Sequence, residues 1–134
     1  MEPTNTPSAG LSPTATLSVG LPVGRIQASL PDQAESVVLS IISLSNPRQQ
    51  AFVLKVSVEG TLNGQRVDVP LGIVSPFPAD QPAAFALPLP VEAERLITAS
   101  RGQVSLVINL GAADAARPLG PPLEMVVGTG PPAS

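Results

Sequence analysis

The sequence has no cysteine and no histidine, and these two absences exclude most of the side-chain chemistry that enzymes use. Without cysteine the chain forms no disulfide bond and offers no thiolate nucleophile. Without histidine it lacks the commonest general base and the commonest metal ligand. Ser-His-Asp and Cys-His triads cannot be built, and zinc, copper and iron–sulfur sites lose their usual ligands. We therefore expect no enzyme, no cofactor and no metal site.

Aromatic residues and positive charges are also scarce. The chain has three phenylalanines, no tyrosine and no tryptophan, so the usual stacking platforms for bases and sugars are missing. Seven basic against ten acidic residues leave a formal net charge of −3, which argues against nucleic-acid binding. No apolar run approaches the roughly 20 residues that span a bilayer, and the first ten residues do not resemble a secretory signal. The sequence leaves the compartment open; a virion or a multiprotein complex would be compatible.

What the sequence does contain is aliphatic residues and turn formers. Of its 134 residues 43% are hydrophobic, and 17 are proline and 11 glycine. Valine, leucine, isoleucine and alanine must therefore build the core. Because helices rarely tolerate so much proline, this composition predicts one β-domain with many turns.

The clearest structural signal is a β-hairpin around Asn63-Gly64, the pair most favoured in a two-residue type I′ turn. Apolar and polar residues alternate on both sides of this pair, as in strands with one buried face. If the pair is the loop, Val58 faces Val69 and Val56 faces Leu71, so that all four lie on one side of the ribbon.

The same register places Glu59 opposite Asp68. Two like charges in this position oppose the hairpin by a few tenths of a kcal/mol. The two carboxylates could instead hold a cation, but no other oxygen ligands cluster nearby in the sequence. Two solvated charges are the preferred interpretation.

Further strand patterns, separated by Pro- and Gly-rich turns, predict about seven strands in an all-β, antiparallel two-layer sandwich, Ig-like or jelly-roll-like. Because proline donates no backbone hydrogen bond, Pro88 and Pro90 require one of these strands to lie at an edge of its sheet or to end a ladder there. One helix-like stretch covers residues 91–100. The remaining strand patterns lie at 25–30, 37–44, 84–90, 102–111 and 123–128.

The sandwich domain is expected at 25–128, between an N-terminal arm or linker at 1–24 and a tail at 129–134. The arm is rich in proline, serine, threonine and glycine, which is typical of an extended or disordered segment. Sparse apolar residues on it could dock on a neighbouring protein or on this domain's own surface. These candidate partner-binding residues include Leu11, Leu17, Val19 and Leu21.

Two further residues are candidates for partner contacts. Phe77 lies between two prolines in a stiff loop, where it could insert into a partner's pocket or tuck into this domain's own core, which we favour. Arg48, beside two glutamines, could contact the rim of an interface.

The order of the segments "VVLSIISL", "FVLKVSVEG", "LGIVSPF", "AFALPLPVEAERL" and "GQVSLVINL" resembles the C-terminal β-sandwich domain of tyrosinase-family polyphenol oxidases. Phe52 stands where that family has tyrosine, and the histidine-rich copper domain is absent. The resemblance implies an accessory layer that covers an oxidase and has no copper or oxidase activity of its own.

Three functions follow from these observations. The first is a non-catalytic structural or assembly protein, such as a capsid decoration protein or an accessory subunit, whose arm contacts neighbours or other copies of the chain. The second is a shielding domain or small subunit of a tyrosinase-like copper oxidase. The third is a ligand- or carbohydrate-binding sandwich, which the absence of tyrosine and tryptophan weakens.

Overall fold

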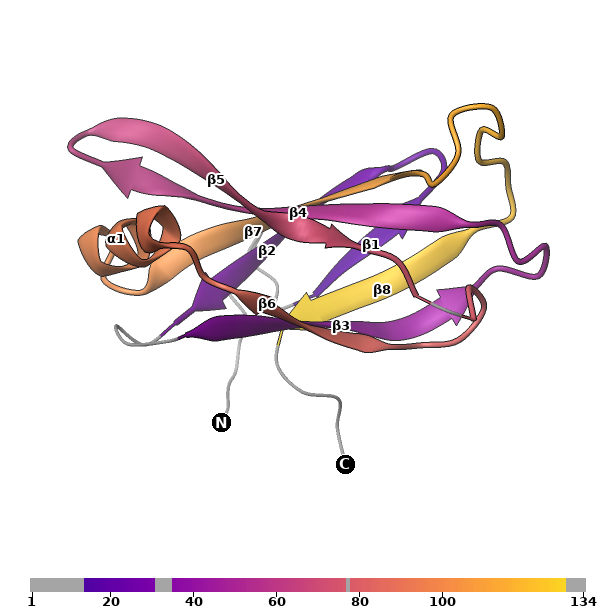
Figure 1. The fold of residues 1–134 in the computed structure, drawn as a ribbon, viewed down its shortest axis with the longest axis horizontal. Helices are drawn as coiled ribbons and strands as arrows, with labels where there is room; N and C mark the ends of the chain where they lie inside the picture. The colour runs from indigo at the N-terminus through magenta and orange to yellow at the C-terminus, as the bar shows by residue number, and fades with distance from the viewer. Residues whose placement is uncertain (1–13, 31–34, 77, 130–134) are drawn as a thin grey trace, which may run out of the picture.

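The structure is a computed structural model, and it describes residues 14–30, 35–76 and 78–129. Two antiparallel four-stranded sheets pack face to face, and a short helix lies at one end (Figure 1). The all-β two-layer sandwich expected from the sequence is therefore confirmed. The elements are β1 (Thr14–Ser18), β2 (Val23–Ser29), β3 (Ser36–Ser45), β4 (Phe52–Leu62), β5 (Gln65–Val74), β6 (Ala84–Pro88), α1 (Val91–Ala99), β7 (Gln103–Ala112) and β8 (Glu124–Thr129).

The first sheet, here called sheet A, has the strand order β1-β8-β3-β6, and the second, sheet B, has the order β2-β7-β4-β5. The chain passes from one sheet to the other at every connection except the β4–β5 hairpin. Strand β6, with Pro88 at its end, lies at the edge of sheet A as expected, since proline donates no backbone hydrogen bond.

The β4–β5 hairpin keeps the expected register near its turn and loses it further away. Val58 pairs with Val69, as the Asn63-Gly64 turn predicts. The register then shifts between Val56 and Ser57, so Val56 pairs with Gly72. The expected pairing of Val56 with Leu71 is thus wrong. A β-bulge places one extra residue in β5, and a bulge leaves no mark on the alternation of a sequence.

Strand β1 lies inside the segment that the composition assigns to a separate arm, which corrects the expected boundary at residue 25. Thr14 pairs with Gly128 in β8, and the Leu17 side chain is completely buried. A Cβ atom on Gly24 in β2 would lie 2.9 Å from Leu17 Cδ2, so β1 and β2 approach each other closely. The sandwich therefore begins at Thr14.

The expected tail also begins one residue too early, because Thr129 is the last residue of β8. Residues 1–13 of the expected arm and residues 130–134 of the expected tail lie outside the described residues.

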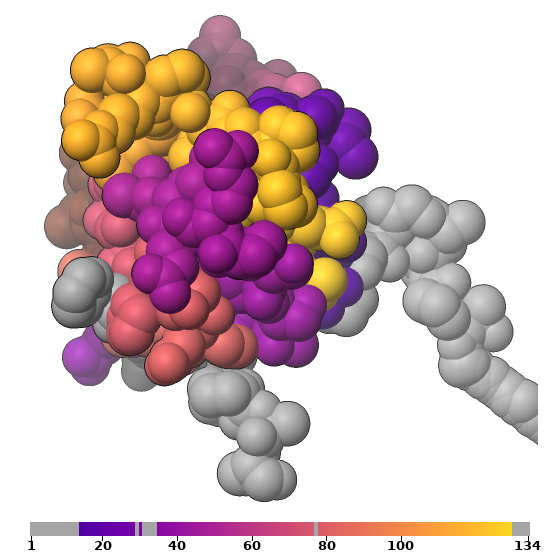
Figure 2. Space-filling view, turned by 90° about the vertical axis from the view of Figure 1, so that its right-hand side faces the viewer, coloured from indigo at the N-terminus to yellow at the C-terminus, as the bar shows by residue number. Residues whose placement is uncertain are grey.

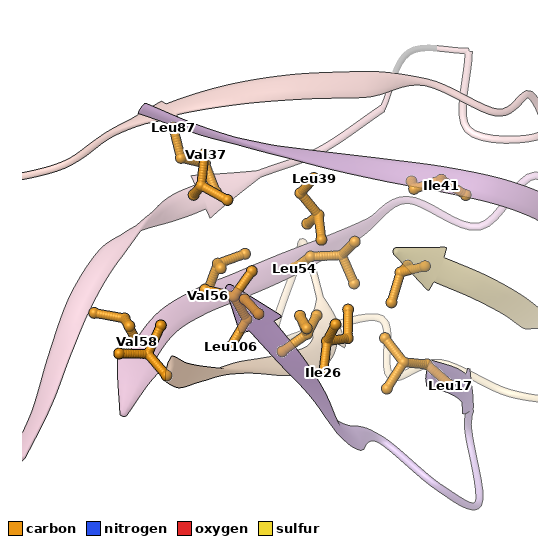
Figure 3. Packing of buried hydrophobic residues seen from close by; sticks show 14 of the residues in the cluster. Leu17, Ile26, Val37, Leu39, Ile41, Leu54, Val56, Val58, Leu87 and Leu106 are labelled. Carbon is orange, nitrogen blue, oxygen red and sulfur yellow. The ribbon is translucent and has the colours of Figure 1, made fainter. Parts of the chain in front are cut away.

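The core fills the space between the two sheets with aliphatic side chains. Leu39 and Ile41 of β3 point from sheet A toward Leu54 and Ile26 of sheet B (Figure 3). Phe52 is also completely buried and is the largest side chain in this cluster. Burial of this many aliphatic groups, at about 25 cal/mol per Å², is the main stabilisation available to the domain.

Helix α1 covers one open end of the sandwich, beneath the β4–β5 hairpin (Figure 1). Its buried side chains are Ala93, Leu96 and Ile97. Gly60 in β4 permits this packing, because a Cβ atom there would lie 2.9 Å from Ser100 Oγ and 3.1 Å from Leu96 Cδ1.

Candidate functional site

The outer face of sheet B carries an exposed row of side chains that crosses all four strands. Val23 in β2 pairs with Asn109 in β7, Asn109 pairs with Lys55 in β4, and Lys55 pairs with Ile73 in β5. All four side chains are exposed, and Val23 and Ile73 keep 51% and 62% of their surface in water. The row thus has an apolar side chain at each end and a lysine beside its centre.

Lys55 is the single lysine of the chain. Within the described part of the chain it makes no ion pair. Together with Pro70, Ile73 and Asn109 it lines an open groove at the bulge between β4 and β5. The ammonium group is therefore available to a ligand or partner that covers this groove.

More apolar side chains flank the row on the same face. Val53 alternates along β4 with the buried Phe52 and Leu54 and therefore points outward. Val107 alternates in the same way along β7. Val53, Val23, Pro70 and Ile73 form what we call the apolar patch, whereas Val107 is nearly buried. Leu21, two residues before Val23 in the turn between β1 and β2, is 65% exposed, the most exposed large hydrophobic residue described.

The remainder of the same face carries charges that pair with one another. Arg25 in β2 donates to Glu59 in β4, and Arg66 in β5 lies 4.0 Å from the same carboxylate. Because β7 separates β2 from β4, the Arg25–Glu59 pair spans β7. Val107 is the cross-strand neighbour of Arg25 and is only 9% exposed although it points outward. The aliphatic stem of an arginine covers apolar surface in this way.

Glu59 pairs with Asp68 as the hairpin register predicts. Arg25 and Arg66 supply the opposite charge to Glu59, the less exposed member of this carboxylate pair. Among the described residues no three histidine, cysteine, aspartate or glutamate side chains lie close enough together to hold a metal ion.

Sheet A differs sharply in charge from sheet B. Glu124 is the one charged residue in its four described strands, whereas the strands of sheet B carry five. The outward side chains of sheet A are mostly small, and its one strongly exposed large apolar residue among those described is Ile42, beside the bulge in β3. The combination of exposed apolar side chains with an unpaired charge is therefore found on sheet B.

The residues predicted as partner contacts differ in burial and position. Leu17 is a core residue, so the prediction of a partner contact there is wrong. Val19 is half-buried and packs against the core. Leu21 is exposed in the turn that precedes β2. Leu11 and Phe77 lie outside the described residues.

Arg48 belongs to a cluster of loops at the opposite end of the molecule from α1. Its guanidinium is 3.4 Å from the carbonyl oxygen of Pro121. Nearby, Gln50 and Gly120 exchange two hydrogen bonds of 2.6 and 2.8 Å between the glutamine amide and the backbone. Figure 2 views this end and shows the β3–β4 and β7–β8 loops gathered together. Arg48 is exposed there, but its contact is with this chain's own loop.

Asn46 joins the β3–β4 loop to the β5–β6 loop from a buried position. It is 3% exposed, and its amide nitrogen donates to the carbonyl oxygens of Gln50 and Ala79 at 3.0 and 2.8 Å. Its carbonyl oxygen accepts from the Gln50 backbone at 3.1 Å. The β3–β4, β5–β6 and β7–β8 loops therefore form one hydrogen-bonded unit, and their polar residues serve the fold.

No protein-family model, curated protein or solved structure matches the chain. Within the residues that the structure describes, no helix has the length and apolar character needed to cross a membrane.

The sequence analysis singled out neither Lys55 nor the row around it. The β5 bulge places Ile73 opposite Lys55, and Val23 and Asn109 join them through the pairing of β7 with both β2 and β4. Asn109 is more than 50 residues from both Val23 and Lys55 in the sequence, and no local sequence pattern predicts its pairing with them. Because a bulge leaves no mark on the alternation of a sequence, no local signal places Ile73 beside the single lysine.

Proposed function

We propose that this chain is a non-catalytic assembly protein that docks on a larger protein partner through the outer face of sheet B. The observation that carries the proposal is the exposed row in which Val23 and Ile73 flank Lys55 and Asn109. Apolar side chains gathered on one face of a folded domain mark interaction surfaces, whereas exposed apolar residues scattered singly do not.

The composition of this face suits an interface. A protein interface has an apolar centre, where charged residues are few, and a polar rim. The apolar patch would supply the apolar side chains of such a centre, with Lys55 as its one charge. The paired charges of Arg25, Glu59 and Arg66 lie next to it and match such a rim.

The two sheets also provide a rigid platform for docking. Val23 and Ile73 lie on strands, so the geometry of the patch is fixed by backbone pairing rather than by loops. A preformed surface loses little conformational freedom on binding, which favours affinity. The residues of the expected arm from Thr14 onward form part of the sandwich. In this proposal the surface that contacts the partner is therefore the outer face of sheet B and not the arm.

The test is co-purification from the native host with a tagged full-length chain. Val23→Gln and Ile73→Gln place polar amides in the patch without adding charge. Ile42→Gln is the matched control, because Ile42 is also an exposed strand residue, at 54%, but belongs to sheet A. Urea denaturation of each variant checks that the fold is intact.

We expect the wild-type chain and Ile42→Gln to recover the same stoichiometric partner. Each patch variant should reduce its recovery by about tenfold, as loss of roughly 1.4 kcal/mol of binding free energy does. Equal recovery by folded patch variants and wild type would contradict the proposal.

A further inference from the structure

We infer that the partner presents a carboxylate, from an aspartate or glutamate side chain set among apolar groups, to the ammonium of Lys55. This inference rests on the proposed function and specifies the chemistry of the partner at the same site. It follows from where Lys55 lies and from which charges around it are already neutralised.

Any protein that covers both ends of the row also covers its middle. Val23 and Ile73 lie at the two ends of the row, on the two edge strands of sheet B, and Lys55 lies between them on β4. A partner that buries Val23 and Ile73 together therefore removes water from around Lys55. Burial of an ammonium without an opposite charge is strongly unfavourable.

The described part of this chain does not supply that opposite charge. Glu59, the closest carboxylate on β4, is engaged by Arg25 and Arg66. Asp68 lines the same groove as Lys55 but makes no ion pair with it among the described residues. We therefore assign the neutralising group to the partner, in line with the charge complementarity seen across specific interfaces.

A second copy of this chain fits the site less well. In a symmetric dimer with a two-fold axis through the centre of the row, Val23 would cover Ile73 of the other copy. Lys55 lies next to that centre, so the same axis would bring two ammonium groups within about 5 Å, the spacing of neighbouring strands. Two like charges at this distance in a desolvated interface are repulsive. The geometry therefore favours a different protein as the partner.

The carboxylate preference can be measured on the full-length, ¹⁵N-labelled chain with small probes. Hexanoate carries an apolar chain and a carboxylate, hexylamine carries the same chain with the opposite charge, and inorganic phosphate carries charge alone. Amide chemical shifts of Val53, Lys55, Ile73 and Asn109 report binding at the patch. Lys55→Gln removes the ammonium while leaving the strand and the apolar patch in place.

We expect saturable shifts at these amides with hexanoate and none with hexylamine or, at equal ionic strength, with phosphate. Lys55→Gln should lower the hexanoate affinity at least about fivefold, because the charge pair is lost. Equal binding of hexanoate and hexylamine, phosphate shifts as large as those of hexanoate, or an unchanged Lys55→Gln variant would each overturn the inference. So would a dimer in light scattering that Ile73→Gln abolishes.

Failure of this inference can be told apart from failure of the proposed function. If Val23→Gln and Ile73→Gln lose the partner but the chain does not bind hexanoate in preference to hexylamine, the docking face is supported and the assignment of a carboxylate is wrong. If the patch variants keep the partner, the docking face itself is wrong.

Discussion

Arg25 and Glu59 join strands β2 and β4 across the intervening strand β7. Glu59 has 13% of its side chain exposed and pairs across the hairpin with Asp68, so the Arg25 guanidinium supplies the charge that two adjacent carboxylates require. One long-range ion pair thus balances the local repulsion within the hairpin and also covers Val107.

Removal of Arg25 should therefore destabilise the fold, and removal of Asp68 should stabilise it. We expect Arg25→Gln to lower the free energy of unfolding by about 1 kcal/mol, the upper end for a partly exposed ion pair. Asp68→Asn should raise it by a few tenths of a kcal/mol, as loss of a like-charge cross-strand pair does. Urea denaturation at low salt measures both changes, and added salt should reduce them. A destabilised Asp68→Asn variant would show that Asp68 has a favourable partner instead.

Two leucines of the expected arm should respond oppositely to truncation. Leu17→Ala removes a completely buried side chain from between the sheets, and we expect a loss of about 2–4 kcal/mol in the free energy of unfolding. Leu21→Ala removes a side chain that is 65% exposed, so its effect on stability should stay within about 0.5 kcal/mol. Thermal or urea denaturation of the two variants measures both changes in the free energy of unfolding. Similar effects of the two substitutions would contradict the assignment of β1 to the sandwich.

The loop cluster at the end opposite α1 should depend on Asn46. Asn46→Ala removes three hydrogen bonds and leaves partly buried backbone groups of Gln50 and Ala79 without these partners. We expect a loss of about 2–3 kcal/mol, because an unsatisfied buried polar group costs about 1–3 kcal/mol. Gln49→Ala, which removes only an exposed hydrogen bond to Asp80, is the matched control and should change stability little. The exchange rate of the Gln50 backbone amide reports the loss of its hydrogen bond to the Asn46 side chain. An unchanged exchange rate in Asn46→Ala would contradict the role of Asn46 in holding these loops.

Gly60 should tolerate no side chain. Gly60→Ala drives a Cβ atom into Ser100 and Leu96, and we expect a loss of about 1–3 kcal/mol as α1 is displaced from β4. Gly111→Ala in β7 is the control, since its Cβ would meet Val53 at 3.9 Å, an ordinary contact. Denaturation of both variants measures the difference. A fully stable Gly60→Ala variant would mean that α1 packs less closely on β4.

The parts of the fold that the sequence predicted are those encoded by local patterns. The Asn63-Gly64 turn sets its own register, so the pairing of Val58 with Val69 followed from a few neighbouring residues. The helix after Pro90 and the edge position of β6 followed from the effect of proline on backbone hydrogen bonds.

The parts that the sequence did not predict depend on contacts between distant segments. β1 has only five residues, and its inward face offers only Ala15 and Leu17, so it resembled the linker around it. Its strand character comes from pairing with β8. The Arg25–Glu59 pair and the row through Lys55 likewise required the order of the strands in sheet B, which no local pattern specifies.

Site-specific photo-cross-linking in the native host tests the central claim, docking through the outer face of sheet B, most directly. A photoreactive side chain at position 73 lies in the apolar patch, and one at position 42 lies exposed on sheet A. Our account predicts one discrete cross-linked protein from position 73 and none from position 42. The reverse pattern, or the same product from both positions, would contradict it.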